Sequence, residues 1–240
     1  MRRLVFVICL ALLLIPCAAG ADTITYNGIQ QAGLNIKGYV DYNRKYASTG
    51  EFDISWNEEE VLAAYCTSIL SSGVGGSYNV YALSDFDYTI YNNLYRAAWI
   101  MENYAPGLGS GSSYSDTVEA TAVQSAIWAL LTPYYYSPFY LSYVTSGTTT
   151  EKYQAKALYT QILAESAGVD FGSYAFQNMF HFADSLQNKQ DLLFATERVT
   201  PGVPEPGSML LFGSALAGAW GYRFRLRRKK KDEDKAEAEA

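Results

Sequence analysis

The chain has 240 residues, of which 49% are hydrophobic and 15% aromatic, a composition typical of one folded core with terminal segments. Residues 22–203 hold 8 Lys and Arg against 18 Asp and Glu. So acidic a region repels phosphate backbones, which excludes nucleic acid as a partner. The chain has one histidine, His181, which excludes zinc sites built from several His ligands. We expect no metal and no organic cofactor.

Residues 1–21 have the pattern of a secretory signal peptide. A basic start precedes the uninterrupted apolar run 4–15, and small residues follow before Asp22. Cys17 also permits a lipoprotein signal, but Pro16 stands where a small residue is expected. We therefore expect the protein to be exported.

Residues 22–201, which lie between the two terminal segments, are long enough for one domain. Alternating residues predict short strands in 22–57 and 78–91. A capping box at Ser55 and Glu58 predicts that a helix begins there, since Val61, Leu62, Tyr65 and Ile69 recur at helical spacing. Four more helices are predicted at 92–104, 116–131, 151–166 and 174–186. Strands first and helices later indicate an α+β fold with short antiparallel strands mainly in the N-terminal part and about five helices.

A second apolar segment lies near the C-terminus. Residues 207–222 carry no formal charge, and seven Lys and Arg follow within 223–231. At 1.5 Å per residue the segment spans about 24 Å, which suits a short transmembrane helix with its basic end in the cytoplasm. The alternative is a buried core helix, which would have to accommodate those cations at its end.

The residues before this segment are Pro204, Glu205 and Pro206. The tripeptide, the apolar span and the basic stop together make 203–231 resemble the PEP-CTERM sorting signal of exported Gram-negative proteins. The resemblance implies recognition by an exosortase-type membrane transpeptidase, removal of the tail, and delivery to the cell surface or extracellular matrix. The charged residues 232–240 are an addition to that pattern.

Cys66 is the one cysteine outside the predicted signal peptide, since Cys9 and Cys17 lie within it. In an oxidising compartment this lone thiol has no internal disulfide partner. It is therefore an inert buried residue, a nucleophile, or a partner in some other covalent bond.

Gln124 follows 58 positions later on the predicted helix 116–131, in the run Val-Gln-Ser-Ala-Ile-Trp. Together with Tyr65-Cys66-Thr67, this run resembles the two motifs of thioester domains in bacterial surface adhesins. The resemblance extends over about 24–196, and Thr67 departs from it because an apolar residue is usual there. It implies that Cys66 provides the sulfur and Gln124 the acyl carbon of an internal thioester.

The implied chemistry suits these residue types. A thioester is activated toward amines, and holding Cys66 against Gln124 makes its formation effectively intramolecular. The bond must be shielded from water; Trp128 lies one helical turn from Gln124, and Tyr65 precedes the cysteine. Attack by a lysine amine of a surface protein or matrix component would attach the two molecules covalently. Each molecule reacts once, so we expect an adhesin rather than an enzyme.

Two other functions are compatible with the sequence. A cysteine hydrolase would have to use His181 as the base for Cys66. A non-covalent carbohydrate-binding or matrix-structural module would use the tyrosines, 20 of 21 of which follow the signal peptide, including Tyr134-Tyr135-Tyr136.

Overall fold

A long antiparallel hairpin begins the domain. The computed structural model describes residues 21–109, 113–133 and 135–197. Strands β1 (Asp22–Val40) and β2 (Asn43–Trp56) pair from end to end across a two-residue turn. The turn residues Asp41 and Tyr42 have φ of 48° and 64°, as a tight hairpin turn with the right-handed strand twist requires. Three register shifts along the pair bend it around the helices.

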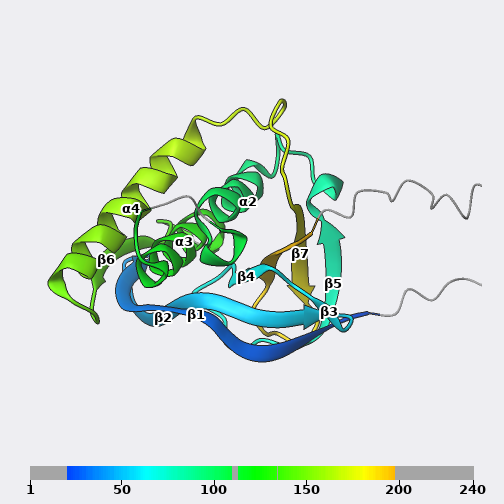
Figure 1. Ribbon diagram of the computed structural model, residues 1–240, viewed down its shortest axis with the longest axis horizontal. Helices are drawn as coiled ribbons and strands as arrows, with labels where there is room; N and C mark the ends of the chain where they lie inside the picture. Colours follow the sequence, from blue (N-terminus) through cyan, green and yellow to red (C-terminus); the bar gives the residue numbers. More distant parts are fainter. Residues whose placement is uncertain (1–20, 110–112, 134, 198–240) are drawn as a thin grey trace, which may run out of the picture. The chain divides into compact units, whose positions relative to one another are not determined.

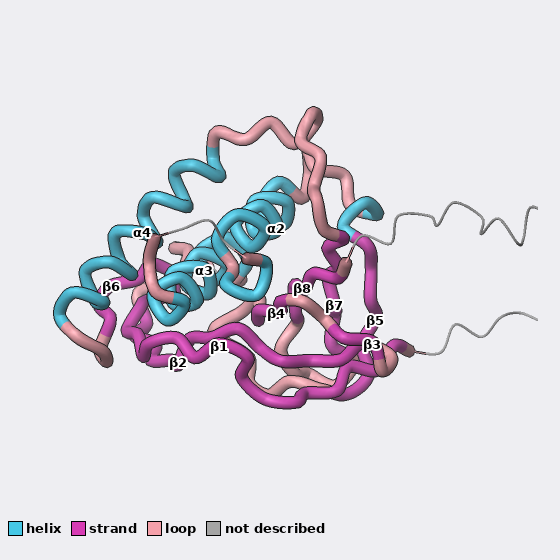
Figure 2. Tube along the Cα trace, in the orientation of Figure 1, coloured by secondary structure: helices cyan, strands magenta, loops and turns pink. Residues whose placement is uncertain are grey.

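The other strands join this hairpin in one antiparallel sheet (Figure 2). The order is β3-β2-β1-β5-β7-β8-β4, and β6 pairs with the far half of β1. These strands are β3 (Glu59–Glu60), β4 (Ala63–Cys66), β5 (Gly76–Ala82), β6 (Tyr140–Val144), β7 (Met179–Ser185) and β8 (Leu192–Thr196).

Three α-helices occur among the described residues: α2 (Asn92–Tyr104), α3 (Asp116–Leu131) and α4 (Thr149–Ala167). Two short 3-10 turns, η1 (Leu83–Asp85) and η2 (Pro106–Leu108), flank α2. Helix α3 lies between α2 and α4 and above β1 and β2 (Figure 1). Every residue of 118–128 is buried, so polar side chains of α3 in that stretch lie inside the core.

The predicted α+β class is confirmed, and so are the helices predicted at 92–104, 116–131 and 151–166. Helix α4 begins with a full capping box, in which Thr148 and Glu151 satisfy each other's backbone N–H groups. The predicted number of about five helices is wrong, because the structure has strands in the two other segments.

The helix predicted from Ser55 and Glu58 is replaced by β3 and β4. Asn57 and Glu58 have positive φ and form a turn, which is incompatible with the start of a right-handed helix. All four residues of β4 are buried. A strand buried on both faces has a continuous apolar pattern, which periodicity does not distinguish from a buried helix.

The helix predicted at 174–186 is also wrong, since Met179–Ser185 is β7. This strand is central, with β5 on one side and β8 on the other. Its aromatic residues favour a strand over a helix, and the short segment met the criteria for both. The strand-like pattern predicted for 78–91 is correct only as far as Ala82, where η1 begins.

The predicted signal peptide (1–21), apart from its last residue, and the predicted transmembrane segment (207–222) lie outside the described residues. Within the described ranges, no helix combines the length and apolar character needed to span a membrane.

Candidate functional site

Cys66 is the last residue of β4, where it pairs with Leu192 of β8. Its side chain is 2% exposed and is unpaired with any other cysteine. Because β4 lies under α3, the strand delivers the thiol to the inside of the domain rather than to its surface.

Gln124 is in the middle of α3 and is 1% exposed. Its side chain makes two hydrogen bonds with Cys66. The Cys66 thiol donates a hydrogen bond to Gln124 Oε1 at 3.4 Å, and Gln124 Nε2 donates to the Cys66 backbone carbonyl at 2.8 Å. The second bond orients the amide plane, so the acyl carbon is held next to the sulfur.

The surroundings keep the thiol neutral. Burial raises the pKa of Cys66 from 9.0 to about 12, and the nearby Trp128 side chain opposes this rise. In an apolar site a thiolate is poorly solvated, so departure of the Cys66 sulfur as a leaving group is unfavourable while the site is closed.

Trp128 lies on the next turn of α3, and its shielding of the site stays a prediction. It is 2% exposed, and its buried indole N–H is the group that acts on the Cys66 sulfur. Phe139 packs against the indole, with ring centroids 5.8 Å apart. Sequence reasoning missed Phe139, because a single aromatic residue in the segment before β6 carries no pattern.

Tyr65 is fully buried, and its hydroxyl donates to Glu51 Oε2 at 2.8 Å. Since side chains alternate along a strand, Tyr65 points to the opposite face of β4 from Cys66. Glu51 also accepts from Gly107 N at 3.3 Å, and burial raises the pKa of its carboxyl group. Shielding of the thiol by Tyr65 stays a prediction.

Thr67, the departure from the family motif, is accommodated by the residue directly before β8. Its backbone N–H donates to the Asp191 carbonyl at 3.0 Å, and its hydroxyl donates to the same oxygen at 3.3 Å. Further along, Ile69 N donates to Thr132 Oγ1 at 3.3 Å. The polar side chain is therefore satisfied, and the segment after Cys66 is attached to the end of α3.

His181 lies on β7 rather than on the predicted helix. Its ring stacks on Phe194 and packs against Trp56, and Nε2 lies 3.3 Å from Thr196 Oγ1. Burial lowers its pKa. Within the described chain none of these neighbours is Cys66, so the structure does not bring the cysteine and the histidine together.

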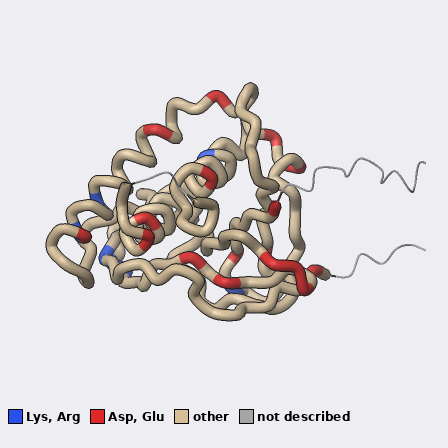
Figure 3. Tube along the Cα trace, viewed as in Figure 1, with Lys and Arg blue, Asp and Glu red and all other residues tan. Residues whose placement is uncertain are grey.

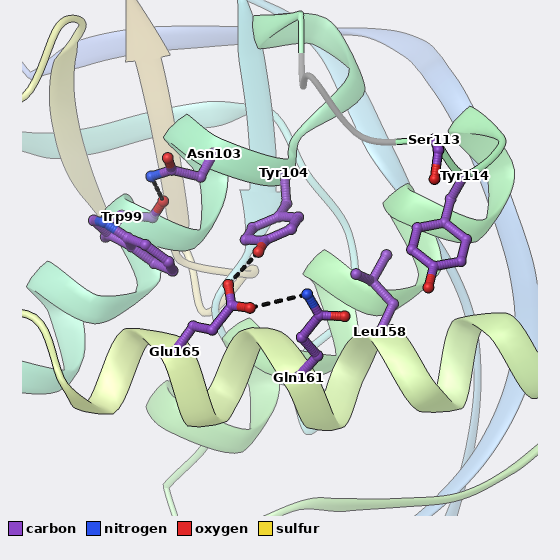
Figure 4. Close-up of a pocket in the computed structure, with 8 residues that line it drawn as sticks. All are labelled: Trp99, Asn103, Tyr104, Ser113, Tyr114, Leu158, Gln161 and Glu165. Carbon is purple, nitrogen blue, oxygen red and sulfur yellow. Dashed lines mark hydrogen bonds between the residues drawn. The ribbon is translucent and has the colours of Figure 1, made fainter.

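A separate hollow of about 590 Å³ lies between α2, α4 and the segment leading into α3 (Figure 4). Its lining includes Tyr104, whose hydroxyl donates to Glu165, and Gln161, which donates to Glu165 at 2.9 Å. Neither Cys66 nor Gln124 lines it. No cluster of three or more His, Cys, Asp or Glu placed to hold a metal ion occurs in the described part of the chain.

Comparison with protein families agrees with this geometry. Residues 63–168 match the family model described as a thioester domain, and both Cys66 and Gln124 lie inside the match. Residues 202–229 match the PEP-CTERM protein-sorting motif. The chain therefore contains one region similar to thioester domains and one similar to PEP-CTERM sorting motifs. Both resemblances predicted from the sequence are thereby confirmed.

Two solved structures are similar to the thioester domain and its surroundings. One is the N-terminal domain of the Streptococcus pyogenes pilus tip adhesin Cpa, with 13% identity and a TM-score of 0.45 over 72% of this chain and 98% of that one. The other is the N-terminal thioester domain of a surface protein from Clostridium perfringens, with 14% identity and a TM-score of 0.39 over 68% and 99%. The search of curated proteins gives no match.

The PEP-CTERM match indicates an exported cell-surface protein with an exosortase-type processing partner. The tripeptide of Pro204, Glu205 and Pro206 lies within that match but outside the described residues. The thioester-domain match indicates covalent adhesion in general terms.

Proposed function

We propose that the protein attaches covalently to amine-bearing surface or matrix molecules through an internal thioester between Cys66 and Gln124. The observation that carries this proposal is the hydrogen bond of the Cys66 thiol to Gln124 Oε1 at 3.4 Å in a site closed to water. The family match over residues 63–168 supports it.

Bond formation requires no external reactant. The Cys66 sulfur adds to the side-chain carbonyl carbon of Gln124, the carbon–nitrogen bond breaks, and the thiol proton leaves with the nitrogen as ammonia. The hydrogen bond from Gln124 Nε2 to the Cys66 carbonyl holds the leaving nitrogen away from the sulfur. This fixed geometry makes the step effectively intramolecular.

Burial then protects the product. Hydrolysis would release the sulfur as a thiolate, which the closed site destabilises, as the raised pKa of Cys66 indicates. Water would also have to pass Trp128, which packs against Phe139. The thioester therefore persists until the cover over it moves.

Reaction with a partner consumes the bond once. A lysine amine of the target forms an amide with the Gln124 acyl carbon, and the sulfur leaves and takes up a proton as the Cys66 thiol. Nothing in these steps regenerates the thioester, so the protein is an adhesin and not a turnover enzyme. The PEP-CTERM tail would place it on the surface or in the matrix of a Gram-negative bacterium.

Methylamine tests the proposal on the exported, purified protein. We expect methylamine to add to the wild-type chain at Gln124, as located by peptide mass spectrometry, and not to add to Cys66→Ala. Addition to Cys66→Ala would contradict the proposal, and so would a wild-type chain that never reacts, even after mild unfolding.

The same protein preparation distinguishes the adhesin from a cysteine hydrolase. A hydrolase requires its base, whereas the adhesin has no chemical role for His181. Methylamine incorporation that is lost in a folded His181→Gln variant would favour the hydrolase.

A further inference from the structure

The outer face of the three strands β2, β1 and β6 carries alternating aromatic and cationic side chains. Ile36 and Val40 on β1 point into the core, so Lys37 and Tyr39 point outward. Their register partners extend two rows across the sheet. One row is Arg44, Tyr39 and Tyr140, and the next is Tyr46, Lys37 and Tyr143.

The side chains of these two rows support one another. The Tyr39 and Tyr140 rings stack with planes 15° apart, and the Lys37 ammonium lies 5.6 Å from the Tyr39 ring centre. The Arg44 guanidinium lies beside the Tyr39 hydroxyl. Contacts of this kind hold cations and rings in fixed positions along the face.

The second row is open to solvent. Tyr46 is 65% exposed and Tyr143 is 62% exposed. Lys37 and Lys156 of α4 lie 5.4 and 5.8 Å from the Tyr143 ring centre. The rings and ammonium groups are therefore available to a partner that lies flat on the sheet.

A third row, which contains Asn35 and its register partner Ser48, is polar and borders a cavity. A cavity of about 410 Å³ next to Tyr46 is lined in part by Asn35, Ser48 and Thr145. Ser48 donates to Asn35 Oδ1 at 2.7 Å, so amide and hydroxyl groups face this space. Its volume lies in the range of small-ligand sites.

Positive charge is concentrated at this end of an acidic domain (Figure 3). The described residues contain seven Lys and Arg against 18 Asp and Glu. Five of the seven lie on β1, β2 and the first half of α4, at positions 37, 44, 45, 152 and 156. Local positive charge attracts an anionic partner to this end of the domain although the net charge of the domain is negative.

An acidic side chain in the turn at this end of the domain is bound by backbone groups. Asp41, in the turn between β1 and β2, accepts backbone N–H bonds from Tyr135, Tyr136 and Ser137 at 2.7 to 3.0 Å. Tyr135 and Tyr136 are thereby held beside the face and are strongly exposed. The turn therefore adds aromatic surface beside the face, and the Asp41 carboxylate is directed to these backbone N–H groups.

We propose that this aromatic–cationic face (Lys37, Tyr39, Arg44, Tyr46, Tyr140, Tyr143 and Lys156) binds an acidic polysaccharide whose sugar rings carry carboxylates. Tyrosine rings pack against the apolar faces of sugar rings, and the cations between them pair with the carboxylates. The polar hollow takes sugar hydroxyl groups. Polyglutamate would use the cations but has no rings to match the tyrosines.

Polygalacturonate is the probe, with uncharged dextran and polyglutamate as comparisons. We expect the protein to bind polygalacturonate more tightly than either, and binding to weaken as salt rises from about 0.01 to 1 M. Equal binding of polyglutamate would overturn the proposal in favour of an acidic-protein partner. Equal binding of dextran, or no binding of polygalacturonate, would also overturn it.

Point variants locate the site. Lys37→Gln and Tyr143→Ser should each weaken polygalacturonate binding about tenfold, the effect of losing one good contact. Gln187→Glu changes the net charge as Lys37→Gln does, and Tyr81→Ser removes an exposed tyrosine of β5; both should bind as wild type. Equal affinity across all four folded variants would contradict the assignment.

This non-covalent site does not rest on the thioester. Cys66→Ala should bind polygalacturonate as the wild type does, whether or not the wild-type chain reacts with methylamine. Loss of polygalacturonate binding in a folded Cys66→Ala variant would overturn the proposal.

Discussion

The Phe139 ring meets the Trp128 indole edge to face, with centroids 5.8 Å apart and ring planes inclined by 78°. Trp128 lies on the turn of α3 after Gln124, where we propose that it covers the thioester, and Phe139 directly precedes β6. The pair therefore connects the cover of the buried site to the strand that carries the exposed Tyr140 and Tyr143.

Replacing Phe139 by Leu should loosen this cover without unfolding the domain. The edge-to-face contact contributes about 1 kcal/mol beyond buried area, and a leucine retains most of the volume. We expect faster hydrolysis of the thioester, measured by mass spectrometry as conversion of Gln124 to glutamate over time. Phe171→Leu, a buried ring in a different aromatic cluster, is the matched control and should hydrolyse as wild type.

Gly38 on β1 fixes the position of Phe139. A Cβ at this glycine would lie 2.1 Å from Phe139 Cε2 and 2.9 Å from the Tyr140 carbonyl oxygen. Gly38→Ala should therefore destabilise the domain by about 1–3 kcal/mol through overpacking. In Gly168→Ala the new Cβ would lie 3.7 Å from the Glu165 carbonyl oxygen, so this substitution should change the free energy of unfolding little. Urea unfolding of both variants measures the difference, and equal midpoints would refute the role assigned to Gly38.

The free thiol of a Gln124→Ala variant should be unreactive. A pKa raised from 9.0 to about 12 leaves about a thousandfold less thiolate than an ordinary cysteine has at neutral pH. Iodoacetamide should therefore label the folded variant far more slowly than the same variant in urea. Equal labelling rates in the two states would show that the site is open.

Glu51 should give the domain a specific pH dependence. Burial raises the pKa of its carboxyl group above the usual 4.5, so folding favours the neutral form more than the unfolded chain does. Its stabilisation is complete below the unfolded pKa and is lost as pH rises through the folded one. The free energy of unfolding of wild type relative to Glu51→Gln should fall as pH rises above about 4.5. A difference that stays constant across this range would contradict a raised pKa.

Local sequence pattern was sufficient for part of the fold. The three helices had clear boundaries or apolar stripes, and the structure adds a capping box at the start of α4. Periodicity failed at β4 and β7, because strands flanked by other elements lose the alternation that marks a half-buried strand. Where these strands lie depends on pairing with β8, which no local pattern encodes.

Of the site, only the two residues that form the proposed bond were predictable from the sequence. Cys66 stood out as a lone cysteine after the signal peptide, and Gln124 stood out through the second motif. Phe139 and Glu51 depend on contacts between segments far apart in the sequence, so their neighbours were hidden. The aromatic–cationic face required the register of β1 with β2 and β6, which brings Lys37 between Tyr46 and Tyr143.

Intact mass of the purified, exported protein tests the central claim most directly. A Cys66–Gln124 thioester predicts a mass about 17 Da below that of the processed sequence, from the loss of ammonia. Methylamine should then replace this deficit by an adduct, and Cys66→Ala should show neither change. A freshly prepared chain at its plain sequence mass, with Cys66 open to alkylation on unfolding and the amide nitrogen of Gln124 retained, would contradict the account.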